Sequence, residues 1–186
     1  SIWTRLMNPI TPHLSEELNN DSELVSASSW PKVEEDKINP KAEAGEELVK
    51  TAREGMRNVL LLTKIQKPRK FTLFAAEEWL YGLFTIVSKE IHATRNTGEI
   101  MKRVLAEEEM KMRGKEISNV VVSLVKDVTK IPAVVTSQEE EVKALQDAQE
   151  FLEKEFGCKI DILLAEKSEH PKAKAAMPGK VGILVE

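Results

Sequence analysis

Two groups of basic residues are the clearest candidates for chemistry in this chain. The first lies in the segment "KIQKPRK", with no acid among its members, and consists of Lys64, Lys67, Arg69 and Lys70. The second lies in a stretch that has no acid between residues 170 and 185, and consists of Lys172, Lys174 and Lys180. Cations grouped in this way suit contacts with nucleic-acid phosphates. The first group is equally well interpreted as a solvated linker, and the second as ordinary protein surface.

Residue types that could support catalysis or metal binding are present but are not arranged for either. The 3 histidines lie in separate segments, with no cysteine or carboxylate at metal-ligand spacing: His13, His92 and His170. The sequence lacks the glycine motifs that cradle phosphate and the nucleophile elbow of hydrolases. Neighbouring acids such as Glu16 and Glu17 diverge from a helix, so we interpret them as solvated surface. We expect no catalytic, metal or cofactor site in this chain.

Composition limits the remaining functions. The chain has 186 residues, 41% hydrophobic, and its 31 acids against 27 bases give a formal net charge of −4. This balance argues against a protein that coats nucleic acid non-specifically, so any contact with RNA must use a local patch. The single cysteine, Cys158, excludes an internal disulfide and fits a reducing compartment. No apolar run approaches the roughly 20 residues of a membrane span, so we expect the cytoplasm.

The first residues predict two helices that meet at a corner. Apolar residues recur there at helical spacing: Ile2, Trp3, Leu6, Met7 and Ile10. Pro9 ends this helix near residue 8, and a second helix starts with Thr11 as its cap and Pro12 in its first position. We expect Leu14 and Leu18 to face inward. A helix with this many apolar residues needs a partner surface to cover them. We therefore infer that the chain is a piece of a larger protein.

Residues 19–40 are polar, contain two prolines and predict a connection. A helix follows at 41–65, where Leu48, Ala52 and Met56 form part of an apolar stripe. Pro68 ends it within the basic segment. We therefore predict a helical segment with a linker over residues 1–67 and a second domain over residues 68–186. Because the helix at 41–65 could pack on either side, a boundary near residue 30 is the alternative.

The second domain is predicted to contain a strand, four helices and two strands, in that order. The expected strands are 71–75, 159–165 and 181–186, and the expected helices are 79–91, 97–109, 117–128 and 137–156. The fold class is therefore mixed: a helical segment followed by a small α+β domain. The aromatic residues fall on predicted core faces, which leaves little surface for stacking on bases: Phe71, Phe74, Trp79, Phe84, Phe151 and Phe156.

Local signals support two of these helices. Three consecutive valines at 120–122 favour a strand, but the spacing of Ile117, Val121 and Leu124 is helical over several turns, and we expect period to outweigh propensity. Ser137 and Glu140 form a capping box for the last helix. Its end is predicted by the glycine at 157.

The segment "W..LMNPITPHLSEELN" resembles a helix corner in the anticodon-binding bundle of class I aminoacyl-tRNA synthetases. The matching residues are Trp3, Leu6, Pro9, Pro12, His13, Leu14, Glu16, Glu17 and Leu18, whereas Asn19 stands where the family often has Trp. "SSWP" at 28–31, "AAEEW" at 75–79 and "KAKAAMPGKVGILVE" at 172–186 are similar to archaeal-type leucyl-tRNA synthetases. The resemblance covers essentially the whole chain. The equivalent region of a valyl or isoleucyl enzyme is the alternative.

The resemblance implies a parent ligase that attaches leucine to tRNA in an ATP-dependent reaction. ATP and leucine would bind upstream domains of the parent, so the resemblance gives this chain no catalytic residue. It implies that the C-terminal module recognises the long variable arm of leucine tRNA. By position, the residues that would contact bases are Gly182, Ile183, Leu184, Val185 and Glu186. The implied partners are leucine-accepting tRNA and the remainder of the parent synthetase.

The chemistry of this last strand is compatible with such a role. A free strand edge offers backbone N–H and C=O groups to unpaired bases, and the carboxylates of Glu186 can accept hydrogen bonds from base amino groups. The turn at Pro178 and Gly179 would aim the strand, and the lysines of the second basic group would hold phosphates. Two interpretations without RNA stay open: the strand simply completes a small sheet beside 160–164, or the chain is a structural docking module.

Overall fold

The computed structural model of the chain describes residues 1–21 and 23–186, so Ser22, within the predicted connection, lies outside the described residues. Contacts within the chain divide it into two compact units, Ser1–Asn39 and Pro40–Glu186. This division falls between the two domain boundaries considered from the sequence, near residue 30 and near residue 67. The helix predicted at 41–65 belongs to the second unit, because it packs against the sheet and another long helix there.

The first unit contains the predicted corner. Helix α1 (Ile2–Met7) ends before Asn8, and helix α2 (Pro12–Glu17) begins with Pro12. Two single turns of 3-10 helix follow in the connection, η1 (Val25–Ala27) and η2 (Glu35–Lys37).

Two details predicted for α2 are wrong. Thr11 stands at the N-cap position as predicted, but its hydroxyl makes no capping hydrogen bond, because it donates instead to the Met7 carbonyl at 3.3 Å. Leu14 and Leu18 do not face inward: they are 45% and 59% exposed, and Ser15 is the buried residue of this helix. The reason is that α2 contacts α1 and η1, and Ser15 lies on the buried side. The apolar residues of this unit therefore remain largely uncovered within it.

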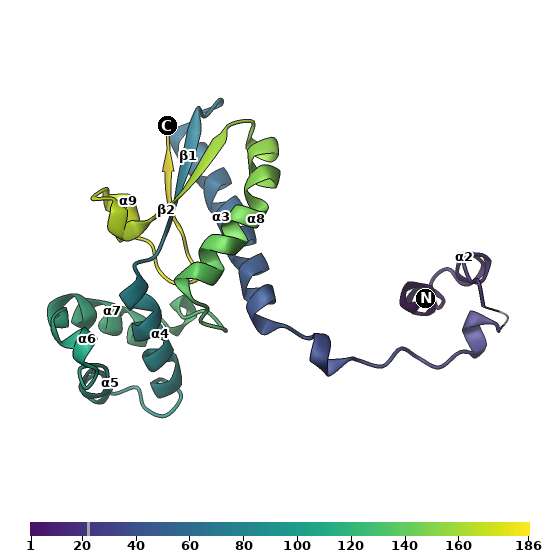
Figure 1. Cartoon of the computed structure of the whole chain (residues 1–186), viewed down its shortest axis with the longest axis horizontal. Coiled ribbons are helices and arrows are strands. Elements are labelled where there is room, and N and C mark those ends of the chain that lie inside the picture. The colour runs from purple at the N-terminus through teal and green to yellow at the C-terminus, as the bar shows by residue number, and fades with distance from the viewer. Residues whose placement is uncertain (22) are drawn as a thin grey trace. The chain divides into compact units, whose positions relative to one another are not determined.

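The second unit is built on a three-stranded sheet in the order β2-β1-β3 (Figure 1). The central strand β1 (Lys70–Ala75) pairs in parallel with β2 (Lys159–Leu164) and antiparallel with β3 (Gly182–Val185). Residues 71–75 of β1 are all buried, as expected for a central strand with layers on both faces.

Two long helices, α3 (Pro40–Thr63) and α8 (Gln138–Phe156), pack side by side against one face of the sheet (Figure 1). Their core with the strands includes Leu48, Ala52, Met56, Leu145, Leu152, Phe71, Leu73 and Ile160. The predicted ends of α8 are confirmed. Ser137 and Glu140 form the capping box, and Gly157 ends the helix with φ of 65°, a left-handed conformation that glycine adopts without strain.

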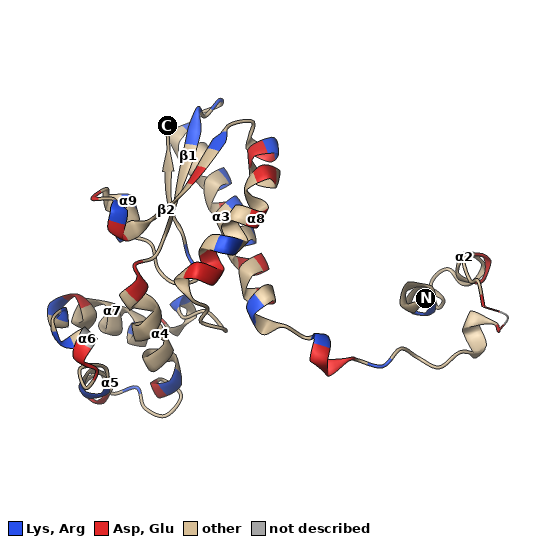
Figure 2. Ribbon diagram, viewed as in Figure 1, with Lys and Arg blue, Asp and Glu red and all other residues tan. Residues whose placement is uncertain are grey.

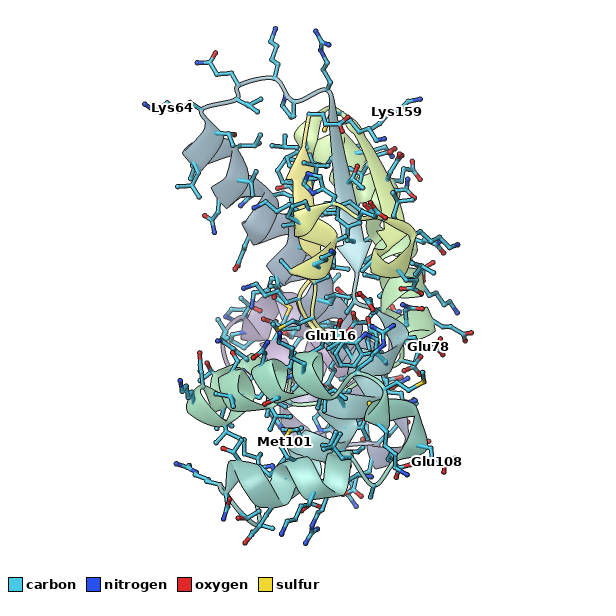
Figure 3. The ribbon with its side chains drawn as sticks, turned by 90° about the vertical axis from the view of Figure 1, so that its left-hand side faces the viewer. Lys64, Glu78, Met101, Glu108, Glu116 and Lys159 are labelled. Carbon is cyan, nitrogen blue, oxygen red and sulfur yellow. The ribbon has the colours of Figure 1, made fainter. Side chains whose placement is uncertain are left out.

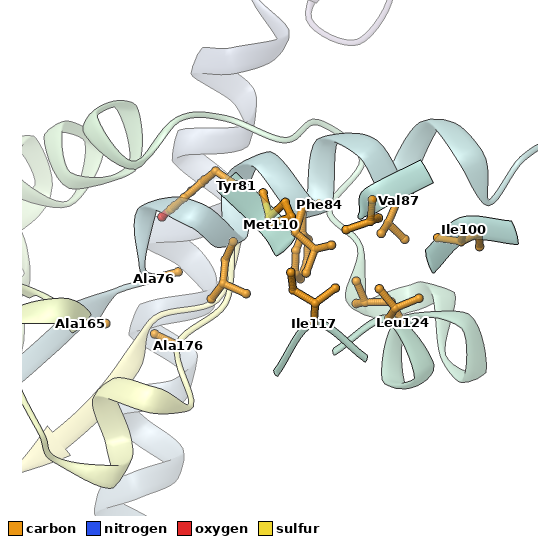
Figure 4. Close-up of a cluster of buried hydrophobic side chains, with 14 of the residues drawn as sticks. Ala76, Tyr81, Phe84, Val87, Ile100, Met110, Ile117, Leu124, Ala165 and Ala176 are labelled. Carbon is orange, nitrogen blue, oxygen red and sulfur yellow. The ribbon is translucent and has the colours of Figure 1, made fainter. Parts of the chain in front are cut away.

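Four shorter helices form a second cluster: α4 (Glu78–Glu90), α5 (Thr97–Val104), α6 (Glu108–Lys111) and α7 (Gly114–Lys126). Their shared core includes Phe84, Val87, Ile100, Ile117 and Leu124 (Figure 4). The helical prediction for the valine-rich segment is confirmed by α7. The unit also contains two single turns of 3-10 helix, η3 (Val128–Lys130) and η4 (Ala165–Lys167).

The mixed fold class is confirmed, but the observed order contains two helices that the sequence did not predict. The predicted helix at 97–109 is interrupted after Val104, and the intervening turn lets Val104 and Met110 enter the same core. The loop predicted around Pro171 contains α9 (Pro171–Lys174), a single turn with Pro171 in its first position. Proline marks loops and first helical positions alike, so its presence did not separate the two.

Candidate nucleic-acid interface

Strand β3 lies at an edge of the sheet, and its hydrogen-bond register shows which backbone groups face outward. Lys70 and Glu186 exchange both backbone hydrogen bonds, with N–O distances of 3.2 and 2.9 Å. Because such pairs alternate along an antiparallel ladder, Leu184 and Gly182 also bond to β1, whereas the N–H and C=O groups of Ile183 and Val185 point away from it. No strand of the described chain pairs with that outer side.

The side chains of β3 are divided between the two faces of the sheet. Ile183 and Val185 pack against the core under α3 and α8, and Leu184 packs against the core on the other face. All three are half-buried, and Glu186 is exposed. The strand therefore completes the sheet, as the simpler interpretation held, but the expected place beside 160–164 is wrong, because β1 lies between β2 and β3. It also leaves a polar backbone edge. The predicted base contacts of residues 182–186 stay a prediction, and they would have to use this edge and Glu186.

Helix α9 brings two of the predicted lysines beside β3. Lys172 and Lys174 are exposed, and α9 contacts both β3 and β1. The contact is close at Gly182, because a Cβ atom added there would lie 2.1 Å from the Lys172 carbonyl oxygen. His170 fixes the start of the helix: its Nδ1 accepts a hydrogen bond from the Lys172 amide at 3.1 Å, and its ring stacks on Phe74.

The predicted turn at Pro178 and Gly179 is present and leads into β3. Met177 and Lys180 exchange backbone hydrogen bonds of 2.9 and 2.8 Å across it. Gly179 has φ of 78°, which a side chain would disfavour. The turn places the exposed Lys180 two residues before the strand.

The first basic group meets the opposite end of β3. The amides of Arg69 and Lys70 both donate to the Glu186 carbonyl, at 2.7 and 3.2 Å. Lys64, Lys67 and Arg69 are exposed, whereas Lys70 is half-buried. Basic groups therefore lie near both ends of the β3 edge, at the start of β1 and on α9 (Figure 2).

Lys70 is already engaged within the protein. Its Nζ lies 2.6 Å from Oδ2 of Asp161 on β2, and this hydrogen bond raises the pKa of the Lys70 ammonium. Among the first basic group, Lys64, Lys67 and Arg69 are therefore better candidates for phosphate contacts.

The structure adds Lys159, which sequence reasoning missed. Lys159 is exposed and is the register partner of Lys70 in the parallel pairing of β2 and β1. Figure 3 shows Lys64 and Lys159 at the same end of the unit. No local signal marks Lys159, because its position depends on a pairing between segments about 90 residues apart.

Other parts of the described chain offer less. Among the described residues, no group of histidine, cysteine or carboxylate side chains could hold a metal ion. No helix of residues 1–21 and 23–186 is sufficiently long and apolar to cross a membrane. The prediction that every aromatic ring named above lies on a core face is wrong for Phe151, which is 55% exposed on α8.

The first part of the chain indicates the class of protein. Residues 1–73 match the family described as "Anticodon-binding domain of tRNA ligase". The match covers the corner of α1 and α2, the connection, α3 and the beginning of β1.

The whole chain is similar to archaeal leucine–tRNA ligases. Over its full length it is 34% identical to the enzymes of Pyrococcus furiosus and Methanococcus vannielii, and 32% identical to that of Pyrococcus horikoshii. The chain spans only 18% to 19% of the length of these relatives. The resemblance to the C-terminal region of an archaeal-type leucyl-tRNA synthetase is thus confirmed, and it favours the leucyl over the valyl or isoleucyl alternative.

Proposed function

We propose that this chain is the C-terminal tRNA-binding part of a cytoplasmic leucyl-tRNA synthetase and that it recognises the long variable arm of leucine tRNA. In this proposal the parent enzyme attaches leucine using ATP, and both small molecules bind other domains of the parent. Residues 1–39 would end the anticodon-binding helical bundle, and residues 40–186, which include the helix α3 that packs on the sheet, would form the tRNA-recognition domain in place of the boundary at 67 expected from the sequence. The chain itself then contributes binding and no catalytic residue.

The observation that carries the proposal is the outer edge of β3. The backbone N–H and C=O groups of Ile183 and Val185 point outward, and the two residues lie about 7 Å apart along the strand. The side chains of the strand pack against the cores on the two faces of the sheet. Such an edge can bond to bases that are unpaired, which is how proteins read RNA sequence. A rigid edge also loses little conformational entropy on binding.

The charges around this edge support an anionic partner. Lys172, Lys174 and Lys180 lie near its beginning, and the first basic group meets its end. Contacts with phosphate would fix the register of the strand on the RNA, whereas the edge itself would read the bases. The overall charge of −4 requires that this attraction be local.

A titration of the chain with leucine tRNA at 50 and 200 mM salt tests the proposal. The informative variant is Lys180→Ala, and the control is Lys154→Ala, which removes an exposed lysine of α8 that is ion-paired with Glu150 of the same helix. Each phosphate contact contributes roughly −0.7 to −0.9 to the slope of log affinity against log salt concentration. Losing one contact should therefore make the ratio of the affinities at the two salt concentrations about threefold smaller. We expect this change in Lys180→Ala and not in Lys154→Ala.

A second tRNA with a short variable arm separates specific from non-specific binding. The proposal predicts tighter binding of leucine tRNA than of the short-arm tRNA, with the difference reduced when Lys172 and Lys180 are both replaced by alanine. Equal binding of the two tRNAs by the unmodified chain would contradict recognition of the variable arm. Failure to bind either tRNA would favour the alternative of a docking module without RNA contact.

A further inference from the structure

A buried carboxylate holds the turn that leads into β3. Glu141, in the first turns of α8, is 3% exposed. Its Oε2 accepts a hydrogen bond from the Tyr81 hydroxyl of α4 at 2.7 Å. Its Oε1 accepts from the Thr136 hydroxyl at 3.2 Å and from the Gly179 amide at 2.7 Å. One side chain thus connects α4, the start of α8 and the turn before β3.

Burial of this carboxylate carries a cost that the fold tolerates. Within the described chain its hydrogen-bond partners are all neutral donors, and burial raises the pKa of Glu141 above the ordinary value despite them. Buried carboxylates without a cation are expensive, and they persist only where every oxygen is satisfied. Figure 4 shows the Tyr81 hydroxyl directed away from Phe84, Val87 and Ile100 of the apolar cluster.

Gly179, whose amide donates to Glu141, has little conformational freedom in the turn. Gly179 has φ of 78°, and an added Cβ would lie 3.1 Å from Pro132. The Met177 and Lys180 backbone bonds close the turn, and only Lys180 and Val181 separate it from β3. Whatever fixes the Gly179 amide therefore fixes where Lys180 projects and where the edge of β3 begins.

We propose that Glu141 is a positioning residue for nucleic-acid binding: through the Gly179 amide it sets the turn that aims Lys180 and the edge of β3 at tRNA. This inference rests on the proposed function of that edge. It adds a residue from a different segment of the chain, which touches no nucleotide itself.

Three substitutions separate positioning from general stability. Glu141→Ala removes all three hydrogen bonds. Glu141→Gln keeps one carbonyl oxygen for Gly179 and Thr136, and its amide group can donate to a rotated Tyr81 hydroxyl. Tyr81→Phe removes one hydrogen bond to Glu141 but leaves the bond to Gly179 in place.

The measurements are the free energy of unfolding, the hydrogen exchange of the Gly179 amide and the affinity for leucine tRNA. We expect the Gly179 amide to exchange at least about tenfold faster in Glu141→Ala, because a hydrogen bond to a charged group is lost. The tRNA affinity of that variant should fall by about as much as in Lys180→Ala, with the same weakened salt dependence, because Lys180 is no longer held in position. Glu141→Gln should stay within about twofold of the unmodified chain on both measurements, and Tyr81→Phe should lose stability but not affinity.

Two results would overturn the inference. One is an unchanged exchange rate of Gly179 in Glu141→Ala. The other is that Tyr81→Phe and Glu141→Ala lose equal stability and also lose equal affinity for tRNA. Glu141 would then have a structural role only. If the alanine variant does not fold, Glu141→Asp replaces it, because the side chain shortened by one methylene keeps its charge but loses its reach to Gly179. Failure of the proposed function shows separately: the unmodified chain and Lys180→Ala would then bind tRNA equally well.

Discussion

The close approach of α9 to β3 makes Gly182→Ala the most informative stability variant. The added Cβ would lie 2.1 Å from the Lys172 carbonyl oxygen and 3.0 Å from its carbon. A carbon atom and a carbonyl oxygen approach to about 3.3 Å, so the backbone of α9 or β3 must move by about 1.2 Å. Neither backbone can rotate away as the end of a side chain could.

The expected cost follows from two opposing effects. Overpacking in a filled core costs about 1–3 kcal/mol, whereas replacing glycine within a strand recovers about 0.5–1 kcal/mol. Because the clash is with backbone, we expect a cost in the upper part of the overpacking range, about 2–3 kcal/mol, so Gly182→Ala should lower the free energy of unfolding by roughly 1–2.5 kcal/mol and the Tm by roughly 2–10 °C for a chain of this size. Urea unfolding and thermal unfolding followed by circular dichroism measure both quantities.

Gly114→Ala is the matched control. Gly114 is the first residue of α7, and an added Cβ meets no heavy atom within 4 Å. Reduced entropy of the unfolded chain should then stabilise this variant by about 0.4–1 kcal/mol. Gly55→Ala should fall between the two, because its Cβ would meet only Cδ1 of Ile183, the end of a flexible side chain. A Gly182→Ala chain as stable as Gly114→Ala would refute the packing of α9 on β3.

Three further predictions concern other parts of the second unit. Ser137→Ala should destabilise the chain by about 1 kcal/mol in urea unfolding, since it removes the capping box of α8; an unchanged midpoint would contradict the cap. Burial raises the pKa of Glu141 in the folded chain, so the folded state binds a proton more readily than the unfolded state. Relative to Glu141→Gln, the unmodified chain should therefore lose stability as the pH rises from about 4.5 through the folded pKa. Parallel profiles of the free energy of unfolding against pH in the two chains would exclude this. Lys159→Ala should lower tRNA affinity with the same weakened salt dependence as Lys180→Ala, which filter binding at two salt concentrations checks; a loss of affinity independent of salt would argue against a phosphate contact.

The predictions from sequence that held depend on local signals. The ends of α8 were predictable because Ser137, Glu140 and Gly157 act on backbone groups within one turn. The helical state of α7 was predictable because its apolar residues repeat over several turns. The resemblance to leucyl-tRNA synthetases was likewise carried by short segments of fixed residue order.

The features that could not be predicted depend on pairing between distant segments. The outward amides of Ile183 and Val185 follow from the register between β3 and β1, and a shift by one residue would exchange them with their neighbours. The place of Lys159 beside Lys70 follows from parallel pairing across the whole helical cluster. Burial of Glu141 was equally hidden, because an acid in the first turn of a helix usually serves the helix dipole at the surface.

The first unit shows a different limit of sequence patterns. The apolar spacing of residues 2–7 correctly indicated the helix α1, but the surface that covers its apolar residues cannot be read from the pattern. Trp3 of α1 and Ile10, which follows that helix, are 73% and 83% exposed within the described chain. A helical period indicates that a face is apolar, and it does not name the partner.

Amide exchange at single residues of β3 tests the central claim most directly. In the free chain the Ile183 and Val185 amides should exchange quickly, whereas the Leu184 amide, bonded to β1, should be protected. Saturating leucine tRNA should slow exchange at Ile183 and Val185 and leave Leu184 as the internal reference. Unchanged exchange at both outward amides in a tRNA complex would contradict recognition of RNA by the edge of β3.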